Sequence, residues 1–198
     1  MKKRNGIAYV LTALVCTLVI AVMPTDAEAR IYEDTVRLHI LARSDSEEDQ
    51  RVKLEIRDTV LDKYGEVLTE CADAGVALDV LKQLCSEIEL TVEERLNELG
   101  YSYGASVEIG EEWYETREYG EFALPEGRYC SLRIILADGA GKNWWCVMFP
   151  PLCTDIATGN APKDDAYFPY TEEEVILVNG GKYQIKFKLL ELFSRAFS

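Results

Sequence analysis

The sequence predicts a mixed α+β fold, formed by one compact domain that follows an N-terminal signal segment. Apolar residues recur at helical spacing over residues 44–100, whereas apolar and polar residues alternate over residues 35–41 and in several segments after residue 105. The chain has 198 residues, a length typical of one domain, and contains no internal repeat. We therefore expect an antiparallel β-hairpin or sheet packed against two to three helices.

The first 29 residues have the pattern of an export signal. Three basic residues at positions 2–4 precede an apolar run over residues 7–23, and Ala27 and Ala29 form an A-x-A cleavage site. The run is slightly short for a spanning helix, which needs about 20 residues, so we favour cleavage over an uncleaved membrane anchor. Both interpretations place residues 30–198, the predicted single domain, outside the cytoplasm.

The chain is acidic, with a formal net charge of −14. Such a surface repels phosphate backbones, so nucleic acid is not expected as a partner, and anionic lipid headgroups are disfavoured. Membrane contact is expected only through the signal segment or through a partner. A solvated acidic surface explains this charge, and binding of a basic protein partner is the alternative.

The first elements of the domain are a strand and a helix. Residues 35–41 alternate and predict a half-buried strand, with His39 on its polar, solvent-facing side. Ser44 and Glu47 have the spacing of a capping box, which predicts a helix that runs to about residue 64. Gly65 can end this helix.

A second helix is predicted between residue 78 and Gly100, because apolar residues recur there at spacings of three and four. Cys85 lies within that stripe and is interpreted as a core residue. Residues 105–109 then predict a strand, and residues 111–119, which include Trp113, predict an exposed aromatic and acidic strand or loop. Residues 154–170 predict a long surface loop, and a further helix is expected from residue 184.

Two strands are predicted at residues 129–137 and 144–149, and the segment between them predicts the loop of a β-hairpin. If Ala137 lies opposite Trp144, alternate residues of the two strands share one natural core face. These residues are Leu132, Ile134, Leu136, Trp145, Val147 and Phe149.

The opposite face of this predicted hairpin is also largely apolar, so water suits it poorly. We favour its coverage by a helix within the fold, and docking of a protein partner is the alternative. For docking, the candidate contact residues are Ile135, Trp144 and Met148, with Trp113 in the neighbouring acidic segment.

Export permits disulfides, and the candidate cysteines are Cys130, Cys146 and Cys153. In the hairpin register Cys130 lies diagonal to Cys153, whereas Cys146 points to the other face, so a Cys130–Cys153 bridge is geometrically easier. However, Pro150 and Pro151 could fold Cys153 back towards Cys146, and the pairing stays open.

Three segments closely resemble the stage II sporulation protein R family: residues 124–153, which contain LPEGRYC and WWCVMFPPLC, residues 37–58 and residues 183–193. The resemblance implies export from the forespore into the space between forespore and mother cell. There, such a protein activates a membrane-embedded aspartic protease, which removes the pro-sequence of sigma-E. The resemblance supplies no binding map at the level of residues.

No catalytic pattern stands out in the sequence. His39 is the single histidine, and no G-x-S-x-G elbow, P-loop, H-E-x-x-H or CxxC motif is present. We therefore expect an intercompartmental signal rather than an enzyme, without cofactor or metal. The alternatives are an exported peptidoglycan hydrolase, which would need an acidic pair such as Glu111 and Glu112, and a structural envelope component.

Overall fold

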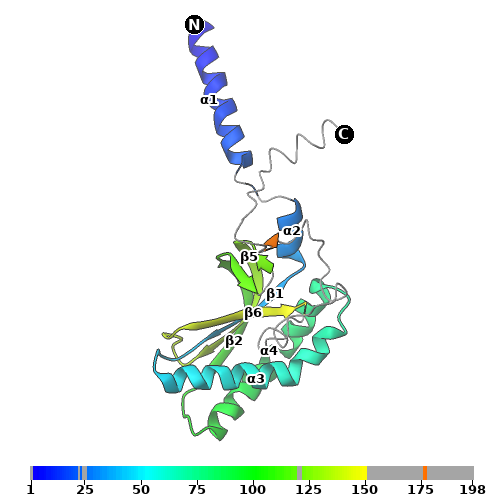
Figure 1. Ribbon diagram of the computed structural model, residues 1–198, viewed down its shortest axis with the longest axis vertical. Coiled ribbons are helices and arrows are strands. Elements are labelled where there is room, and N and C mark those ends of the chain that lie inside the picture. Colours follow the sequence, from blue (N-terminus) through cyan, green and yellow to red (C-terminus); the bar gives the residue numbers. More distant parts are fainter. Residues whose placement is uncertain (1, 22, 24–25, 120–121, 151–175, 178–198) are drawn as a thin grey trace.

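The centre of the fold is strand β1 (Val36–Leu41), which lies between two strands that come much later in the chain. It pairs parallel with β5 (Gly127–Leu136) and antiparallel with β6 (Asn143–Phe149). Strand β2 (Ala105–Tyr114) pairs antiparallel with β5, so the sheet has the order β2-β5-β1-β6. Figure 1 shows β1 within this sheet.

The computed structural model describes residues 2–21, 23, 26–119, 122–150 and 176–177. The long loop predicted at residues 154–170 and the helix expected from residue 184 lie outside these residues. The mixed helix-and-sheet class and the single compact domain are as the sequence predicts.

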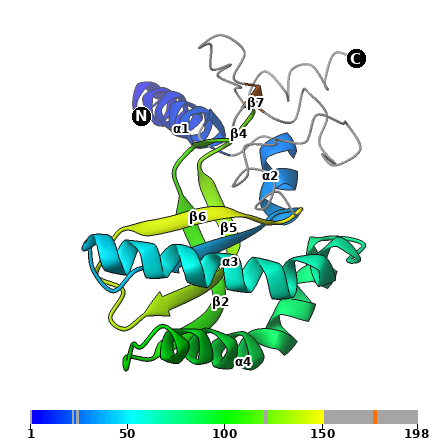
Figure 2. The same cartoon turned by 60° about the horizontal axis from the view of Figure 1, so that its bottom comes forward.

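Two long helices, α3 (Glu47–Thr69) and α4 (Ala74–Glu98), cover one face of the sheet (Figure 2). Alternate residues of β1 point into the core beneath them, and Leu38 and Ile40 are both fully buried. The buried residues from the four strands and two helices form the main core of the domain.

Two helices and three short strands complete the described part of the chain. Helix α1 (Lys2–Ala21) extends away from the sheet, and α2 (Asp26–Glu33) packs near β5 (Figure 1). A second, three-stranded sheet is formed by β3 (Arg117–Tyr119), β4 (Phe122–Leu124) and β7 (Ile176–Leu177).

The predicted hairpin is wrong, because β1 lies between β5 and β6. Their connection crosses the end of β1, where the Gly141 N–H donates to the Ala42 carbonyl at 2.8 Å. A Cβ atom at Gly141 would clash with the Ser44 backbone, so only glycine fits this crossing. A strand whose two faces are both buried satisfies its backbone polar groups best when it is paired on both sides, which favours the central position for β1.

This insertion also changes the faces of β6. The residues that share the helix-covered face with Leu132, Ile134 and Leu136 are Trp144, Cys146 and Met148, not Trp145 and Val147. The register between β1 and its two neighbours determines this outcome, because the side-chain period of a strand is two.

The helix boundaries differ from the sequence prediction by a few residues. Ser46, not Ser44, caps α3, since its hydroxyl accepts the Asp49 N–H at 3.1 Å. Helix α3 continues past Gly65, because burial of Leu68 outweighs the cost of about 1 kcal/mol for an internal glycine. Helix α4 starts earlier than predicted, at a cap formed by Asp73. It ends before Gly100, which has a φ of 86°.

Candidate functional site

The four predicted contact residues do not form one surface. Met148 is 2% exposed in the main core, and Trp144 is half-buried on the same helix-covered face, where the Arg57 guanidinium lies 4.5 Å from its ring centroid. Ile135 lies on the opposite face of the sheet. Trp113, on β2, is 64% exposed and is therefore the accessible member of the set.

The two candidate cysteines that the structure describes differ in their bonding state. Cys146 is disulfide-bonded, whereas Cys71, Cys85 and Cys130 are free thiols. Because Cys130 is a free thiol, the Cys130–Cys153 bridge that the hairpin register favoured is not formed. Cys153 lies outside the described residues.

The free thiols near the core have little nucleophilic character. Burial raises the pKa of the Cys85 and Cys130 thiols, and nearby glutamates raise it further. The Cys85 Sγ–H donates to the Val107 carbonyl at 3.3 Å, which agrees with its interpretation as a packed residue of α4. Thiolate chemistry at these positions is therefore disfavoured at neutral pH.

The predicted cleavage residues Ala27 and Ala29 lie in α2. Just after them, Ile31 is fully buried and the Tyr32 hydroxyl donates to the Glu126 carbonyl at 2.8 Å. A cut after Ala29 would leave both contacts in the mature chain, and the cut itself stays a prediction. Among the described residues, no helix combines the length and the apolar content that a membrane crossing requires.

The second face of the sheet, opposite α3 and α4, carries a polar network that the sequence analysis missed. His39 was expected to face solvent but is 6% exposed, and Arg37 on the same side of β1 is fully buried. Both are covered because aromatic residues from distant segments close over them. The Trp145 ring stacks on His39 with centroids 5.2 Å apart, and the Arg37 guanidinium lies 4.1 Å from the Tyr114 ring centroid.

Glu112 on β2 is the centre of this network. His39 Nδ1 lies 3.0 and 3.1 Å from its two carboxylate oxygens, and Arg133 Nε lies 2.9 Å from one of them. The Tyr114 hydroxyl donates to Glu112 at 3.3 Å and shares a hydrogen bond of 2.6 Å with Ser131. The network thus links β2 to both β5 and β1.

The electrostatics of the network favour an ionised Glu112. Burial alone would raise the pKa of this carboxyl, but the His39 hydrogen bond, the charges of His39 and Arg133, and Tyr114 together lower it. Burial raises the pKa of the Tyr114 hydroxyl, so it stays neutral at physiological pH. Each group therefore holds another in place, and the arrangement serves to fix β2 rather than to present a reactive group.

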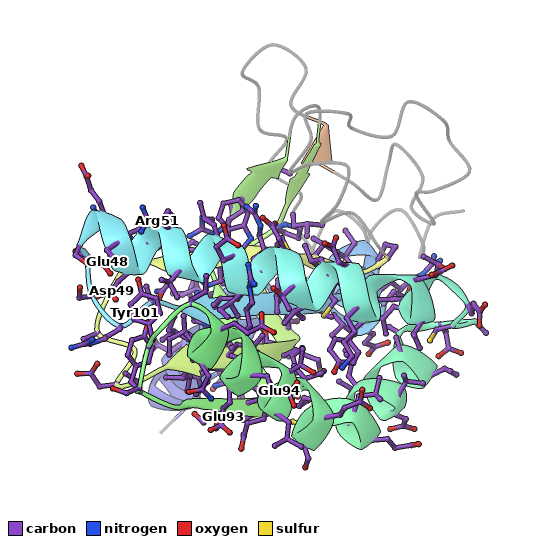
Figure 3. The ribbon with its side chains drawn as sticks, turned by 90° about the horizontal axis from the view of Figure 1, so that it is seen from below. Glu48, Asp49, Arg51, Glu93, Glu94 and Tyr101 are labelled. Carbon is purple, nitrogen blue, oxygen red and sulfur yellow. The ribbon has the colours of Figure 1, made fainter. Side chains whose placement is uncertain are left out.

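Figure 3, seen from below, labels Glu48, Asp49 and Arg51 at the start of α3 and Tyr101 after α4. It labels Glu93 and Glu94 separately, on α4. The Tyr101 hydroxyl donates to Glu48 at 2.7 Å, which ties the segment after α4 to α3. Within the described ranges, no group of His, Cys, Asp and Glu side chains could hold a metal ion.

The remaining feature with binding character is the outer edge of β2. This strand runs for ten residues, pairs only with β5 within the described part of the chain, and carries the exposed Trp113. Sequence patterning identified Trp113 but not the edge, because position in a sheet depends on pairing between distant strands. The alternation of residues 105–114 was the available signal.

Comparison with known proteins gives two matches and one negative result. A family model described as Stage II sporulation protein R matches residues 32–158. A Bacillus subtilis (strain 168) protein named stage II sporulation protein R is 36% identical over 135 residues, which are 68% of this chain and 60% of that relative. The match therefore spans less than two thirds of the relative's length. No solved structure matches the chain.

Proposed function

This chain belongs to the stage II sporulation protein R family, and on that basis we propose that it is an exported intercompartmental signal in endospore formation. A role in sporulation follows from the family itself. In the proposal, the chain is secreted from the forespore into the space between forespore and mother cell. There it activates a membrane-embedded aspartic protease, which then processes pro-sigma-E.

The observation that carries this proposal is the family match over residues 32–158, which spans β1 through β6 and both covering helices. The export pattern of residues 1–29 supports the proposed location. The disulfide at Cys146 is in keeping with an oxidising compartment outside the cytoplasm.

The chemistry of the second face favours binding over catalysis. A hydrolase would need an acid or base that a substrate can reach, but His39 is only 6% exposed beneath the stacked Trp145 ring, and its Nδ1 lies 3.0 Å from the Glu112 carboxylate. In the proposed mechanism the chain activates the protease by binding its active arrangement more tightly than its inactive one. A ligand can shift an equilibrium only by such a difference in affinity.

Co-expression in a non-sporulating host tests the proposal. The chain, its cognate membrane protease and pro-sigma-E are produced together, and the precursor is followed by immunoblot. We expect the precursor to shorten only when the chain is exported. A chain without residues 2–29 is the matched control, because it keeps the domain but stays in the cytoplasm.

Two results of this experiment would decide against the signalling role. One is an unprocessed precursor although all three proteins are made and the chain is exported. The other is equal processing with the cytoplasmic control. Turnover of purified peptidoglycan by the exported chain would then favour the envelope hydrolase.

A further inference from the structure

The pairing of β2 determines which of its backbone groups face outward. The strand pairs with β5 in one unbroken antiparallel register, from Ala105 opposite Leu136 to Tyr114 opposite Gly127. In such a ladder, alternate residues direct both N–H and C=O away from the partner strand. Val107 is one of these, because its N–H and C=O are bonded to α4 and not to β5. By the same alternation, Ile109, Glu111 and Trp113 also face outward.

Helix α4 covers only the beginning of this edge. Glu89 Oε2 accepts the Val107 N–H at 2.9 Å, and the Cys85 thiol donates to the Val107 carbonyl. No hydrogen bond from the described residues reaches the outward backbone groups of residues 109–113. We call this segment the open edge. A row of unpaired strand groups is a template for another strand.

Two residues of the open edge suit the approach of another chain. Gly110 is exposed, and a Cβ added there would meet no atom within 4 Å, so packing within the domain does not require glycine. Glycine inside a regular strand allows another backbone to come close. Trp113 is 64% exposed at the end of the same segment and offers a large apolar anchor.

The charge of the open edge indicates what kind of strand would bind there. Glu111 is 65% exposed, and its Arg128 contact is long, at 3.8 Å. Glu108, three residues earlier on the other face of β2, is 53% exposed and pairs with Arg133 at 2.7 Å, and the whole chain has a net charge of −14. A second copy of this chain would bring the same acidic edge and the same net charge, so edge-to-edge dimerisation is disfavoured. A positively charged strand is complementary.

We propose that the open edge, residues 109–113 of β2, binds an extended, positively charged strand of a protein partner by adding it to the sheet. Main-chain hydrogen bonds to Ile109, Glu111 and Trp113 supply the affinity, and the Trp113 ring contacts an apolar side chain of the incoming strand. The inference deepens the proposed function and rests on it only for the identity of the partner. The network around Glu112 holds the edge in shape before binding.

Glu111→Pro tests the outward backbone groups of β2 without disturbing the pairing of β2 with β5. Proline removes the outward N–H of residue 111, but it leaves the hydrogen bonds from β2 to β5 intact. The preceding Gly110 has no Cβ to clash with the proline ring. Glu111→Thr is the matched control, because it keeps the N–H and removes the same charge and the same exposed Arg128 contact.

The first arm uses the co-expression assay. We expect Glu111→Pro to reduce precursor processing at least about tenfold relative to Glu111→Thr, with equal amounts of exported, folded chain. Equal processing by the two variants would refute strand binding at the open edge while leaving the signalling role in place. Absence of processing with the wild-type chain would count against the signalling role alone. The second arm would then test strand binding at the open edge by itself.

The second arm needs no protease. The exported chain is mixed with a synthetic ten-residue peptide of alternating Lys and Val, and amide hydrogen exchange is followed by NMR. We expect exchange at Ile109, Glu111 and Trp113 to slow at least about tenfold, while Gly110 and Glu112, already bonded to β5, stay unchanged. A peptide N-methylated at every second residue, on the bonding side, should have no effect.

Three results of the second arm would overturn the inference. The first is no slowing with the Lys–Val peptide, and the second is equal slowing with a Glu–Val peptide of the same length. The third is protection of the open edge in the free chain together with a dimer in sedimentation, which would identify a second copy as the occupant.

Discussion

Replacing Glu112 with Gln tests whether the polar network stabilises the domain. The Glu112 carboxylate accepts a hydrogen bond from His39 at 3.0 Å and pairs with Arg133 at 2.9 Å, and its side chain is only 18% exposed. A hydrogen bond to a charged group contributes about 1.5–3 kcal/mol. A neutral amide keeps part of this bonding, so we expect Glu112→Gln to lower the free energy of unfolding by about 2 kcal/mol at neutral pH.

The pH dependence of this loss has a definite sign. The pKa of Glu112 in the folded protein lies below its ordinary value of 4.5. Its stabilising contribution is therefore complete above that value and disappears as the pH falls through the lowered pKa. The difference in unfolding free energy between wild type and Glu112→Gln should be largest near neutral pH and should shrink below about pH 4.

Urea denaturation followed by tryptophan fluorescence measures both quantities. Glu108→Gln is the matched control, because Glu108 pairs with the same Arg133 at 2.7 Å but is 53% exposed. This control should cost less than about 1 kcal/mol. The reasoning is refuted if Glu112→Gln unfolds at the wild-type urea concentration at neutral pH, or if the difference stays constant from neutral to acidic pH.

Three further substitutions test the fold, each by the free energy of unfolding in urea. Gly110→Val should stabilise the chain by about 0.5 kcal/mol, since valine favours strands and the site has space; a loss would show that the position needs glycine. Asp73→Ala should cost about 1 kcal/mol because it removes the cap that accepts the Val76 N–H at 2.8 Å, and no change would show that the cap is dispensable. Gly141→Ala should cost more than about 2 kcal/mol because its Cβ meets the Ser44 backbone, and wild-type stability would contradict the crossing loop.

Local patterns in the sequence predicted the elements themselves. The apolar stripe of α4, the alternation in β1 and the glycine after α4 all carry a signal within a few residues. The cap of α3 was ambiguous because Ser44 and Ser46 each have an acidic residue three positions later. In the folded chain Ser46 forms the cap, and the Ser44 hydroxyl donates to the Asp49 carboxylate instead.

Pairing between distant strands could not be predicted from local patterns. Two strands joined by a short loop are ordinarily neighbours, and only β1, far earlier in the chain, separates β5 from β6. The burial of Arg37 and His39 has the same origin, because the rings that cover them come from Tyr114, Tyr129 and Trp145. The candidate contact surface was divided for this reason, and Trp113 remained exposed.

The central position of β1 has a consequence for the order in which the chain can fold. Val36 pairs with Cys130 on one side and with Phe149 on the other, roughly a hundred residues later. A chain that emerges N-terminus first must therefore keep β1 unpaired until β5 has appeared, and such high contact order slows folding to milliseconds or longer. The topology thus delays closure of the sheet, which is compatible with the export that we propose for this chain.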